Sequence, residues 1–468
     1  MLTKFINWRM ENKYNNIYFL GIGGIGMSAI AQYFHVNNHK VAGYDRYQSD
    51  NCKRLENIGI DIHYEDDINL IPELYKNSTE TLIVYTPAIP EDSTELAYFK
   101  THNFKILKRA EVLGMISQNK VCIAIAGTHG KTSVSTIAAW ILSNTRDSCS
   151  AFLGGVSKNF DSNLHLSSTS NIVVVEADEF DRSFLRLTPT TAIITSIEPD
   201  HLDIYNDFNT LQEAFVEFAG KIKSEGNLIL HKSIKTELFE TSVKNINIYT
   251  YGLNDEDCDF NLKNISYKNN NCYFDIKAPT GLIKNIKYQI GGQHNLENAL
   301  AAAAASLINE ADESTLRKSL ESFAGVIRRF DIKIKTTELI YIDDYAHHPG
   351  EIKAFINAVS EIYPNKKITA VFQPHLFSRT KDFYKEFAEN LSNCHELVLL
   401  PIYPAREKPI KGISSEIIYK YAKVERKHLC TKTELIPLLK SLKPELIVTM
   451  GAGDIDQLVE PIRKEFVK

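Results

Sequence analysis

The chain has 468 residues, of which 44% are hydrophobic and 24% are charged. This balance is typical of a globular protein, and a length of about 150 residues per domain predicts three domains. The net charge of −5 argues against a nucleic-acid partner, because phosphate-binding surfaces normally leave a basic excess. The seven cysteines are scattered, with no C-x-x-C pair, so we expect reduced thiols and a cytoplasmic protein.

No segment of the sequence predicts membrane association. The first residues, MLTKFINWRMENKYNN, lack the apolar core of a signal peptide. The longest apolar run, Ala299 to Ile308, is too short to span a bilayer. Elsewhere, short β-rich runs alternate with helical patterns. This alternation predicts an α/β fold with mainly parallel sheets, in three segments with boundaries near residues 118 and 325.

The first segment opens with a strand at Asn16–Gly21, followed by a Gly-rich turn and a helix from Met27 to His35. The turn, GIGGIG, fits the G-x-G-x-x-G pattern, and Asp45 follows a second strand at 40–44. These features meet the dinucleotide fingerprint. The backbone of such a turn requires only a diphosphate, so a nucleotide sugar fits as well as NAD.

The second segment opens with a strand at Lys120–Gly127, which runs into GTHGKT and a helix from Thr132 to Leu142. Glycines let backbone N–H groups converge on phosphate oxygens at the positive end of the helix. Lys131 is expected to reach the β- and γ-phosphates, and the Thr132 hydroxyl to hold Mg²⁺. Ile125 stands where the usual P-loop has glycine, so the motif is a shortened variant. A tight turn with an incidental lysine is the alternative.

Two further strands of this segment end in polar loops. The strand at 171–176 delivers Glu176, Asp178, Glu179 and Asp181. A carboxylate here suits the oxygen preference of Mg²⁺, although acidic loops are often only solvated turns. The strand at 191–197 ends in EPDHLD, where His201 suits metal or phosphate contact or a structural role. Two such loops after a P-loop favour the functional interpretation.

The motif GGQHNLEN precedes an Ala-rich helix. Asn295 and Asn298 are three residues apart, so on a helix they would share a face and could bind an adenine edge. Capping of the helix is an equally good explanation, because asparagine suits that position.

The third segment opens near Leu339–Tyr345, followed by a helix from Pro349. Its later strands, at 367–373, 396–402 and 445–450, each run into polar or Gly-rich residues. His347, His348, His375 and Arg379 follow these strands and are expected to contact an anion or a substrate, with capping as the alternative. Ligands of open parallel sheets bind beyond the carboxyl ends of strands, which supports this expectation.

In chain order these motifs resemble the Mur ligases of peptidoglycan synthesis, over nearly the whole chain. The sequences that carry the likeness are GIGGIGMSAIA, GTHGKT, EADE, EPDHLDIY, GGQHNLENALAA, RRFD, DDYAHHPGEI, VFQPHLFSRT and GAGD. The resemblance implies three domains: a UDP-sugar-binding Rossmann-like domain (1–118), a central P-loop ATPase-type domain (119–325) and a C-terminal Rossmann-like ligase domain (326–468).

The resemblance also implies the roles of individual residues. It implies that the UDP portion is bound by Gly21, Gly23, Gly24, Gly26 and Asp45. It implies ATP contacts from Gly127, Thr128, His129, Gly130, Lys131, Thr132, Ser133, Asn295, Asn298, Arg329 and Asp344. The implied metal ligands are Thr132, Glu176 and His201. The incoming amino acid would lie near Tyr345, His347, His375 and Arg379, and the implied catalytic residues are Lys131, Glu176, His201 and Arg379.

The activity implied by the resemblance is an ATP- and Mg²⁺-dependent ligation. The lactyl carboxylate of UDP-N-acetylmuramate would attack the γ-phosphoryl group, and the amine of L-alanine would displace phosphate from the acyl phosphate. Neither step needs a protein nucleophile, so positioning and charge neutralisation should dominate. The expected partners are these two small molecules, with no nucleic acid and no membrane, and a homodimer is left open.

The sequence departs from the family pattern at Leu376, where many L-alanine-adding members have arginine. The stretch 213–219 contains no lysine, whereas some sibling ligases carry a modified lysine after the D-H-x-D loop; this favours the L-alanine-adding members. The near alternative is the related ligase that attaches a preformed murein tripeptide to the same sugar nucleotide. A nicotinamide-dependent oxidoreductase and a catalytically silent nucleotide-binding scaffold are the alternatives from other classes.

Overall fold

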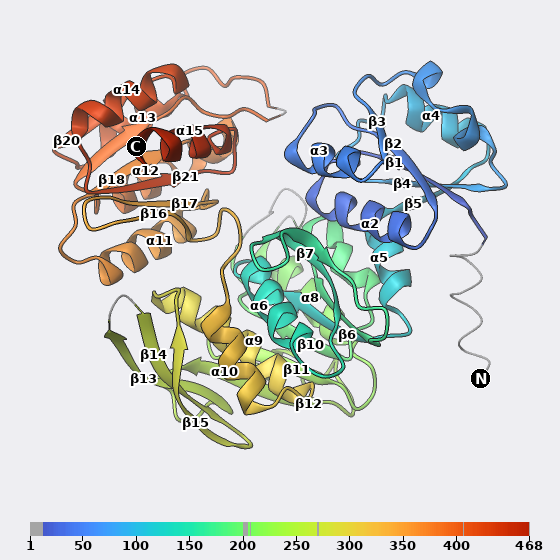
Figure 1. Cartoon of the computed structure of the whole chain (residues 1–468), viewed down its shortest axis with the longest axis horizontal. Helices are drawn as coiled ribbons and strands as arrows, with labels where there is room; N and C mark the ends of the chain where they lie inside the picture. The colour runs from blue at the N-terminus through green and yellow to red at the C-terminus, as the bar shows by residue number, and fades with distance from the viewer. Residues whose placement is uncertain (1–12, 200–204, 206, 269–270, 406, 468) are drawn as a thin grey trace. The chain divides into compact units, whose positions relative to one another are not determined.

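The computed structural model describes residues 13–199, 205, 207–268, 271–405 and 407–467. It has the expected α/β architecture, with three sheets and helices packed on them (Figure 1). The chain divides into two compact units. Unit one contains the described residues of 1–265, 274–287 and 297–324, and unit two those of 266–273, 288–296 and 325–468.

The first sheet belongs to unit one and is parallel throughout. Its order is β3 (Asp61–His63), β2 (Lys40–Tyr44), β1 (Asn16–Leu20), β4 (Thr81–Tyr85) and β5 (Lys105–Lys108). Its helices are α2 (Ile25–Val36), α3 (Asp50–Asn57), α4 (Thr94–Thr101) and α5 (Arg109–Ser117). Side chains alternate along β1, so Ile17 and Phe19 join one core, and Tyr18 and Leu20 join the core on the opposite face.

The second sheet has ten strands, and the P-loop sequence lies at the end of one of its inner strands. Its order is β15 (Gly281–Tyr288), β14 (Asn271–Ala278), β13 (Phe260–Lys268), β12 (Asn247–Leu253), β11 (Asn227–His231), β10 (Thr191–Ile194), β6 (Val121–Ala126), β9 (Ile172–Glu176), β7 (Ser150–Ser157) and β8 (Ser162–His165). Its helices are α6 (Lys131–Ser143), η3 (Phe180–Arg186), α8 (Phe208–Ala219), α9 (Gln293–Ile308) and α10 (Glu313–Ser322).

Strand β6 pairs in parallel with β10 on one side and β9 on the other. The carboxyl ends of these three strands therefore meet at one edge of the sheet, as the sequence predicted. The apolar core of this sheet is continuous with that of the first sheet. This continuity explains why two domain-sized sheets form one compact unit, and the boundary near residue 118 remains a prediction.

The third sheet belongs to unit two. Its order is β16 (Asp331–Lys335), β17 (Ile340–Asp344), β21 (Leu446–Met450), β18 (Ile368–Phe372), β19 (Glu396–Leu399) and β20 (Arg426–Leu429). Its helices are α11 (Pro349–Ile362), α12 (Phe377–Leu391), α13 (Ser415–Tyr421), α14 (Lys432–Leu442) and α15 (Asp456–Phe466). Strand β16 is antiparallel to β17, and the remaining pairs are parallel. Two apolar clusters cover the two faces.

The expected strands and helices are present, and most of their ends lie within two residues of the predicted ones. Strands β10 and β19 end three residues early, at Ile194 and Leu399. In addition, α9 begins at Gln293, so the HNLEN sequence forms its first turns instead of preceding it. The backbone N–H groups of Asn295 and Leu296 donate to the Gly292 carbonyl, which starts the helix early. Within the described ranges, no helix is long and apolar enough to cross a membrane.

Candidate functional site

The P-loop sequence forms the turn between β6 and α6, as predicted. Gly127 and Gly130 have positive φ angles of 132° and 82°, which L side chains rarely adopt. A Cβ at Gly127 would lie 2.1 Å from Thr195 Oγ1, and one at Gly130 would lie 2.5 Å from Asn298 Oδ1. The turn is thus a tight backbone cradle that no larger residue could form.

The segment after β10 braces this cradle. The Thr128 N–H donates to the Ser196 carbonyl at 3.0 Å, and the His129 N–H donates to Ser196 Oγ at 3.0 Å. The Thr128 hydroxyl donates to the Glu198 carbonyl at 3.2 Å. These contacts fix the backbone of the turn before any phosphate is bound. Among the described residues, no side chain caps the N-terminus of α6, so its first N–H groups face the cradle.

Lys131 begins α6, and its ammonium group turns back over the cradle. Nζ donates to the Gly127 carbonyl at 2.7 Å and lies 2.8 Å from Glu179 Oε2. The Lys131 side chain is 14% exposed and that of Glu179 is 1% exposed. Burial lowers the pKa of Lys131, but the carboxylates of Glu179, Asp178 and Glu176 raise it by more, so the lysine stays charged. The sequence identified Glu179 only as one member of an acidic loop.

The predicted metal ligands lie around the same cradle. Thr132 is buried in the first turn of α6. Glu176 ends β9, and its carboxylate packs over Gly154 of β7, where a Cβ would lie 2.1 Å from Oε2. His201 lies outside the described residues. Within those residues there is no group of three or more His, Cys, Asp and Glu side chains that could hold a metal ion.

These residues fit a nucleotide with its magnesium ion. The cradle supplies backbone donors, α6 supplies its positive end, and Lys131 supplies a charge. A threonine hydroxyl and a strand-end carboxylate are the oxygen ligands that Mg²⁺ takes in such sites. Gly154 is a residue that sequence reasoning missed, since its importance depends on the carboxylate packed over it.

The two asparagines of α9 have different surroundings. Asn298 lies in unit one, with its carboxamide against Gly130 of the cradle. Asn295 lies in unit two, and its Nδ2 donates to the Gly291 carbonyl at 2.8 Å. That bond is not a helix cap, because the amide donates to a carbonyl and satisfies none of the free N–H groups of the first turn. A role of either residue in adenine binding stays a prediction.

The Gly-rich turn of the first sheet lies between β1 and α2. Gly21 has a φ of 83°, and the Gly23 N–H donates to Asp45 Oδ2 at 2.8 Å. Asp45 therefore reaches the turn and holds its backbone, and its contact with the UDP portion stays a prediction. A Cβ at Gly26 would lie 2.7 Å from Nη1 of Arg109. Gly24 is the N-cap residue of α2, and no side chain in the described structure caps this helix.

Arg109 is a second residue that the sequence analysis missed. It follows β5 directly, and ligands of open parallel sheets bind beyond the carboxyl ends of strands. That rule could have identified Arg109. Its guanidinium lies against the start of α2 and 3.5 Å from Asp178 Oδ2 in the acidic loop after β9. A cation at the positive end of a helix is unfavourable unless an anion lies close by. Arg109 therefore adds to the anion-binding character of the Gly-rich turn.

In unit two the four residues predicted near the amino acid form one continuous cluster. The ring centroids of Tyr345 and His347 are 5.2 Å apart, and those of His347 and His375 are 6.0 Å apart. Arg379 Nη1 lies 3.4 Å from His375 Nδ1. The segments that carry them follow β17 and β18, so the sheet brings them together. His348 instead packs on Phe383, with ring centroids 5.0 Å apart.

Arg328, Arg329 and Asp344 adjoin this cluster. The guanidinium carbons of Arg328 and Arg329 lie 5.3 and 5.0 Å from the Tyr345 ring centroid. Asp344 is buried and accepts hydrogen bonds from the Phe330 and Ala346 N–H groups at 2.7 and 2.8 Å. Burial raises the pKa of Asp344 to about 6, against the opposing effect of Arg329. Leu376 has a φ of 71° at the N-cap of α12, a position strained for a leucine.

His375 should make the protein sensitive to mild acid. Burial, with the charges of His347 and Arg379, lowers the pKa of His375 from 6.5 to about 4. The unfolded chain therefore binds this proton at a higher pH than the folded chain does. The contribution of His375 to the free energy of unfolding should fall between pH of about 6.5 and about 4, on the order of 2 kcal/mol because the ring is only partly buried.

This prediction is tested by the midpoint of thermal unfolding as a function of pH. His375→Gln removes the titrating ring and should flatten the decline between pH of about 6.5 and about 4. His102→Gln changes an exposed histidine at the C-cap of α4 and should leave the decline unchanged. An equally steep decline in His375→Gln would show that other groups cause it.

The fold and these sites define a three-domain α/β protein with a nucleotide cradle, and comparison with known families agrees. Residues 16–121 match the Mur ligase family catalytic domain, 125–306 the Mur ligase middle domain, and 328–453 the Mur ligase glutamate ligase domain. The chain belongs to the Mur ligase family.

Individual relatives resemble the chain from end to end. It is 46% identical to a UDP-N-acetylmuramate–L-alanine ligase of Parabacteroides distasonis, with 98% of each chain covered. It is 47% identical to a ligase of the same name from Christiangramia forsetii, covering 97% of this chain and 98% of that one. The crystal structure of UDP-N-acetylmuramate-alanine ligase from Thermotoga maritima superimposes with a TM-score of 0.82 at 26% identity, covering 97% and 99% of the two chains.

A murein peptide ligase from Psychrobacter arcticus shares the fold with a TM-score of 0.68 at 22% identity, covering 96% of this chain and 98% of that chain. This likeness supports the fold alone.

Proposed function

We propose that this protein is a cytoplasmic, ATP- and Mg²⁺-dependent ligase that joins L-alanine to the lactyl carboxylate of UDP-N-acetylmuramate. The observation that carries the proposal is the cradle at the end of β6, where Lys131 and the carboxylate of Glu176 converge on one edge of the sheet. The names of the relatives that match the chain over nearly its whole length supply the substrates. The domain boundaries near residues 118 and 325 are part of the proposal.

In the first step, a lactyl oxygen attacks the γ-phosphorus of ATP, and the bond to ADP breaks. The cradle and Lys131 hold the phosphates and neutralise the charge that develops on them. Thr132 and Glu176, with His201, would hold the magnesium ion, which supplies further positive charge to the phosphate oxygens. The N-terminal Gly-rich turn, with Asp45 and Arg109, would keep the diphosphate of the sugar nucleotide in place.

In the second step, the amine of L-alanine attacks the acyl carbon, and phosphate leaves through a tetrahedral intermediate. The histidine and arginine cluster of unit two is suited to bind the amino acid. Arg379 can pair with its carboxylate, because a guanidinium matches a carboxylate with two parallel hydrogen bonds. His375 is neutral at pH 7 and can therefore accept a hydrogen bond from the amine.

The test is phosphate release from Mg-ATP in the presence of UDP-N-acetylmuramate, with either L-alanine or a murein tripeptide as the amine. We expect release with L-alanine, together with UDP-N-acetylmuramoyl-L-alanine detected by mass spectrometry. Release with the tripeptide alone would keep the mechanism but assign the protein to the recycling branch of the family. No release with either amine would overturn the proposal.

A further inference from the structure

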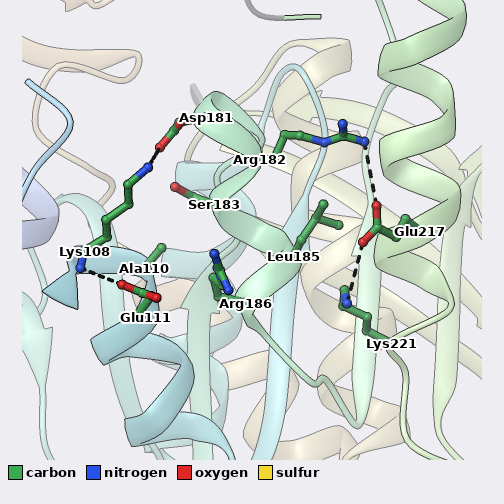
Figure 2. A pocket seen from close by; sticks show the side chains of 10 residues that line it. All are labelled: Lys108, Ala110, Glu111, Asp181, Arg182, Ser183, Leu185, Arg186, Glu217 and Lys221. Atoms are coloured by element: carbon green, nitrogen blue, oxygen red, sulfur yellow. Dashed lines mark hydrogen bonds and ion pairs between the residues drawn. The ribbon is translucent and has the colours of Figure 1, made fainter.

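A cavity of about 420 Å³ lies in unit one (Figure 2). It is open to solvent on one side and is lined by the start of α5, by η3 and by the end of α8 with the turn that follows. Among its described lining residues, none belongs to the Gly-rich turn or to the P-loop. The side chains that bear on the argument are Lys108, Glu111, Arg182, Ser183, Arg186 and Lys221.

The carboxylates of this cavity are already engaged by neighbours. Asp181 Oδ2 lies 2.9 Å from Lys108 Nζ, and Glu111 Oε2 accepts the Lys108 N–H at 2.8 Å. Glu217 is shared between Arg182 and Lys221, each at 3.7 Å. Those two distances exceed a hydrogen bond, so both cations are free to take a closer anionic partner.

Two donors between these groups are not engaged at all. The Arg186 guanidinium and the Ser183 hydroxyl make no hydrogen bond or ion pair within the described part of the chain. Figure 2 shows both side chains between Lys108 on one side and Lys221 on the other. The cavity thus holds four cations against three carboxylates, and its unused groups are donors. A cation ligand has no free carboxylate to bind there.

The backbone of η3 is strained where it forms the wall. Asp181 and Arg182 both have a φ of 53°, in the left-handed region, although neither is glycine. Such residues persist only where the surroundings hold them in place. Here the buried Phe184 anchors the segment, and its N–H donates to the Asp178 carbonyl at 2.9 Å. The strained turn directs Asp181 to Lys108 and leaves Ser183 in the cavity.

We propose that this cavity binds a small phosphate-bearing molecule, held by Arg186 and Ser183 and by Arg182 or Lys221 in exchange for Glu217. A phosphoryl group offers several acceptor oxygens to donors that converge from different elements, which a single carboxylate does not match as well. The uncharged parts of the ligand would lie against Ala110 and Leu185. This site is separate from the one that the proposed function uses.

The first experiment is an arginine footprint on the unmodified full-length protein. Phenylglyoxal labels accessible arginines, and peptide mass spectrometry reports each one separately, so binding of the probe at the P-loop does not confuse the result. With a metal chelator present, inorganic pyrophosphate should slow the labelling of Arg186 several-fold and leave that of exposed Arg426 unchanged. Equal labelling of Arg186 with and without pyrophosphate would overturn the proposal.

The second experiment places a charge in the cavity. The variant is Ser183→Cys combined with Cys430→Ser, because Cys430 is partly exposed and would also react. The new thiol is modified with a methanethiosulfonate that carries either a sulfonate or a trimethylammonium group. The sulfonate is a tetrahedral oxyanion and should give a midpoint of thermal unfolding about 2–4 °C above that of the ammonium adduct. Adding Arg186→Gln should reduce this difference.

The matched control is Ser168→Cys, an exposed position in the loop between β8 and β9, where the two adducts should unfold at the same temperature. Equal midpoints of the two adducts at position 183 would contradict an anion site. The footprint needs no substitution, so it decides the question even if Ser183→Cys fails to fold.

Discussion

Replacing Lys131 with methionine is expected to reduce Mg-ATP turnover by about 10²–10³-fold and to lower the free energy of unfolding by about 3 kcal/mol. Turnover falls because the variant lacks the charge that neutralises the transferred phosphoryl group. Stability falls because Glu179, with a side chain that is 1% exposed, would lose the ammonium group 2.8 Å away. Burial already raises the pKa of Glu179 against the effect of Lys131, so the variant should take up a proton.

The double variant Lys131→Met/Glu179→Gln separates the two effects. It removes both charges of the buried pair, so most of the lost stability should return while turnover stays low. Denaturant unfolding and phosphate release measure the two quantities. Binding of UDP-N-acetylmuramate should persist in both variants, because the Gly-rich turn belongs to the first sheet. Normal turnover of Lys131→Met would refute the P-loop assignment, and purely additive stabilities would show that the pair is not coupled.

Replacing Gly154 with alanine is expected to reduce Mg-ATP turnover by about 10²-fold or more with little loss of stability. A Cβ at this position would lie 2.1 Å from Oε2 and 2.3 Å from Cδ of Glu176, so the carboxylate must move. Gly154 has no left-handed φ, so its backbone accepts alanine, and the effect isolates the position of the carboxylate. The magnesium concentration for half-maximal turnover should rise.

The matched control is Gly350→Ala in α11, where the new Cβ meets no atom within 4 Å. Alanine favours the helix by about 0.5–1 kcal/mol over glycine, so this variant should be slightly more stable and fully active. Magnesium titration of phosphate release compares the two variants. An unchanged magnesium requirement in Gly154→Ala would mean that Glu176 does not hold the metal ion in the position inferred above.

Local patterns predicted the elements and the places where the sites lie. An apolar strand, glycines, Gly-Lys-Thr and a helical pattern follow one another along the chain, so the turn at 127–132 could be located without the fold. The same holds for the Gly-rich turn after β1 and for the polar segments after β17 and β18. Their clustering followed from one rule, that the carboxyl ends of neighbouring parallel strands share an edge.

The sequence could not show which groups the individual residues of a motif contact. It left adenine binding and capping equally good for Asn295 and Asn298, whereas the structure shows the Asn295 amide donating to the Gly291 carbonyl and places Asn298 against Gly130. Gly154 carried no local signal, because it matters only through a carboxylate more than twenty residues further along the chain.

The acidic stretch after β9 shows most clearly what the sequence determined and what only the fold decided. By itself the sequence determined that four carboxylates follow a buried strand beside a P-loop, because hydrophobic periodicity and residue chemistry are local properties. Only the tertiary structure decided where they point, with Glu176 over Gly154, Asp178 to Arg109, Glu179 to Lys131 and Asp181 to Lys108. The reason is that these partners come from β7, β5–α5 and α6, which are distant in the sequence and are brought to this loop only by the fold.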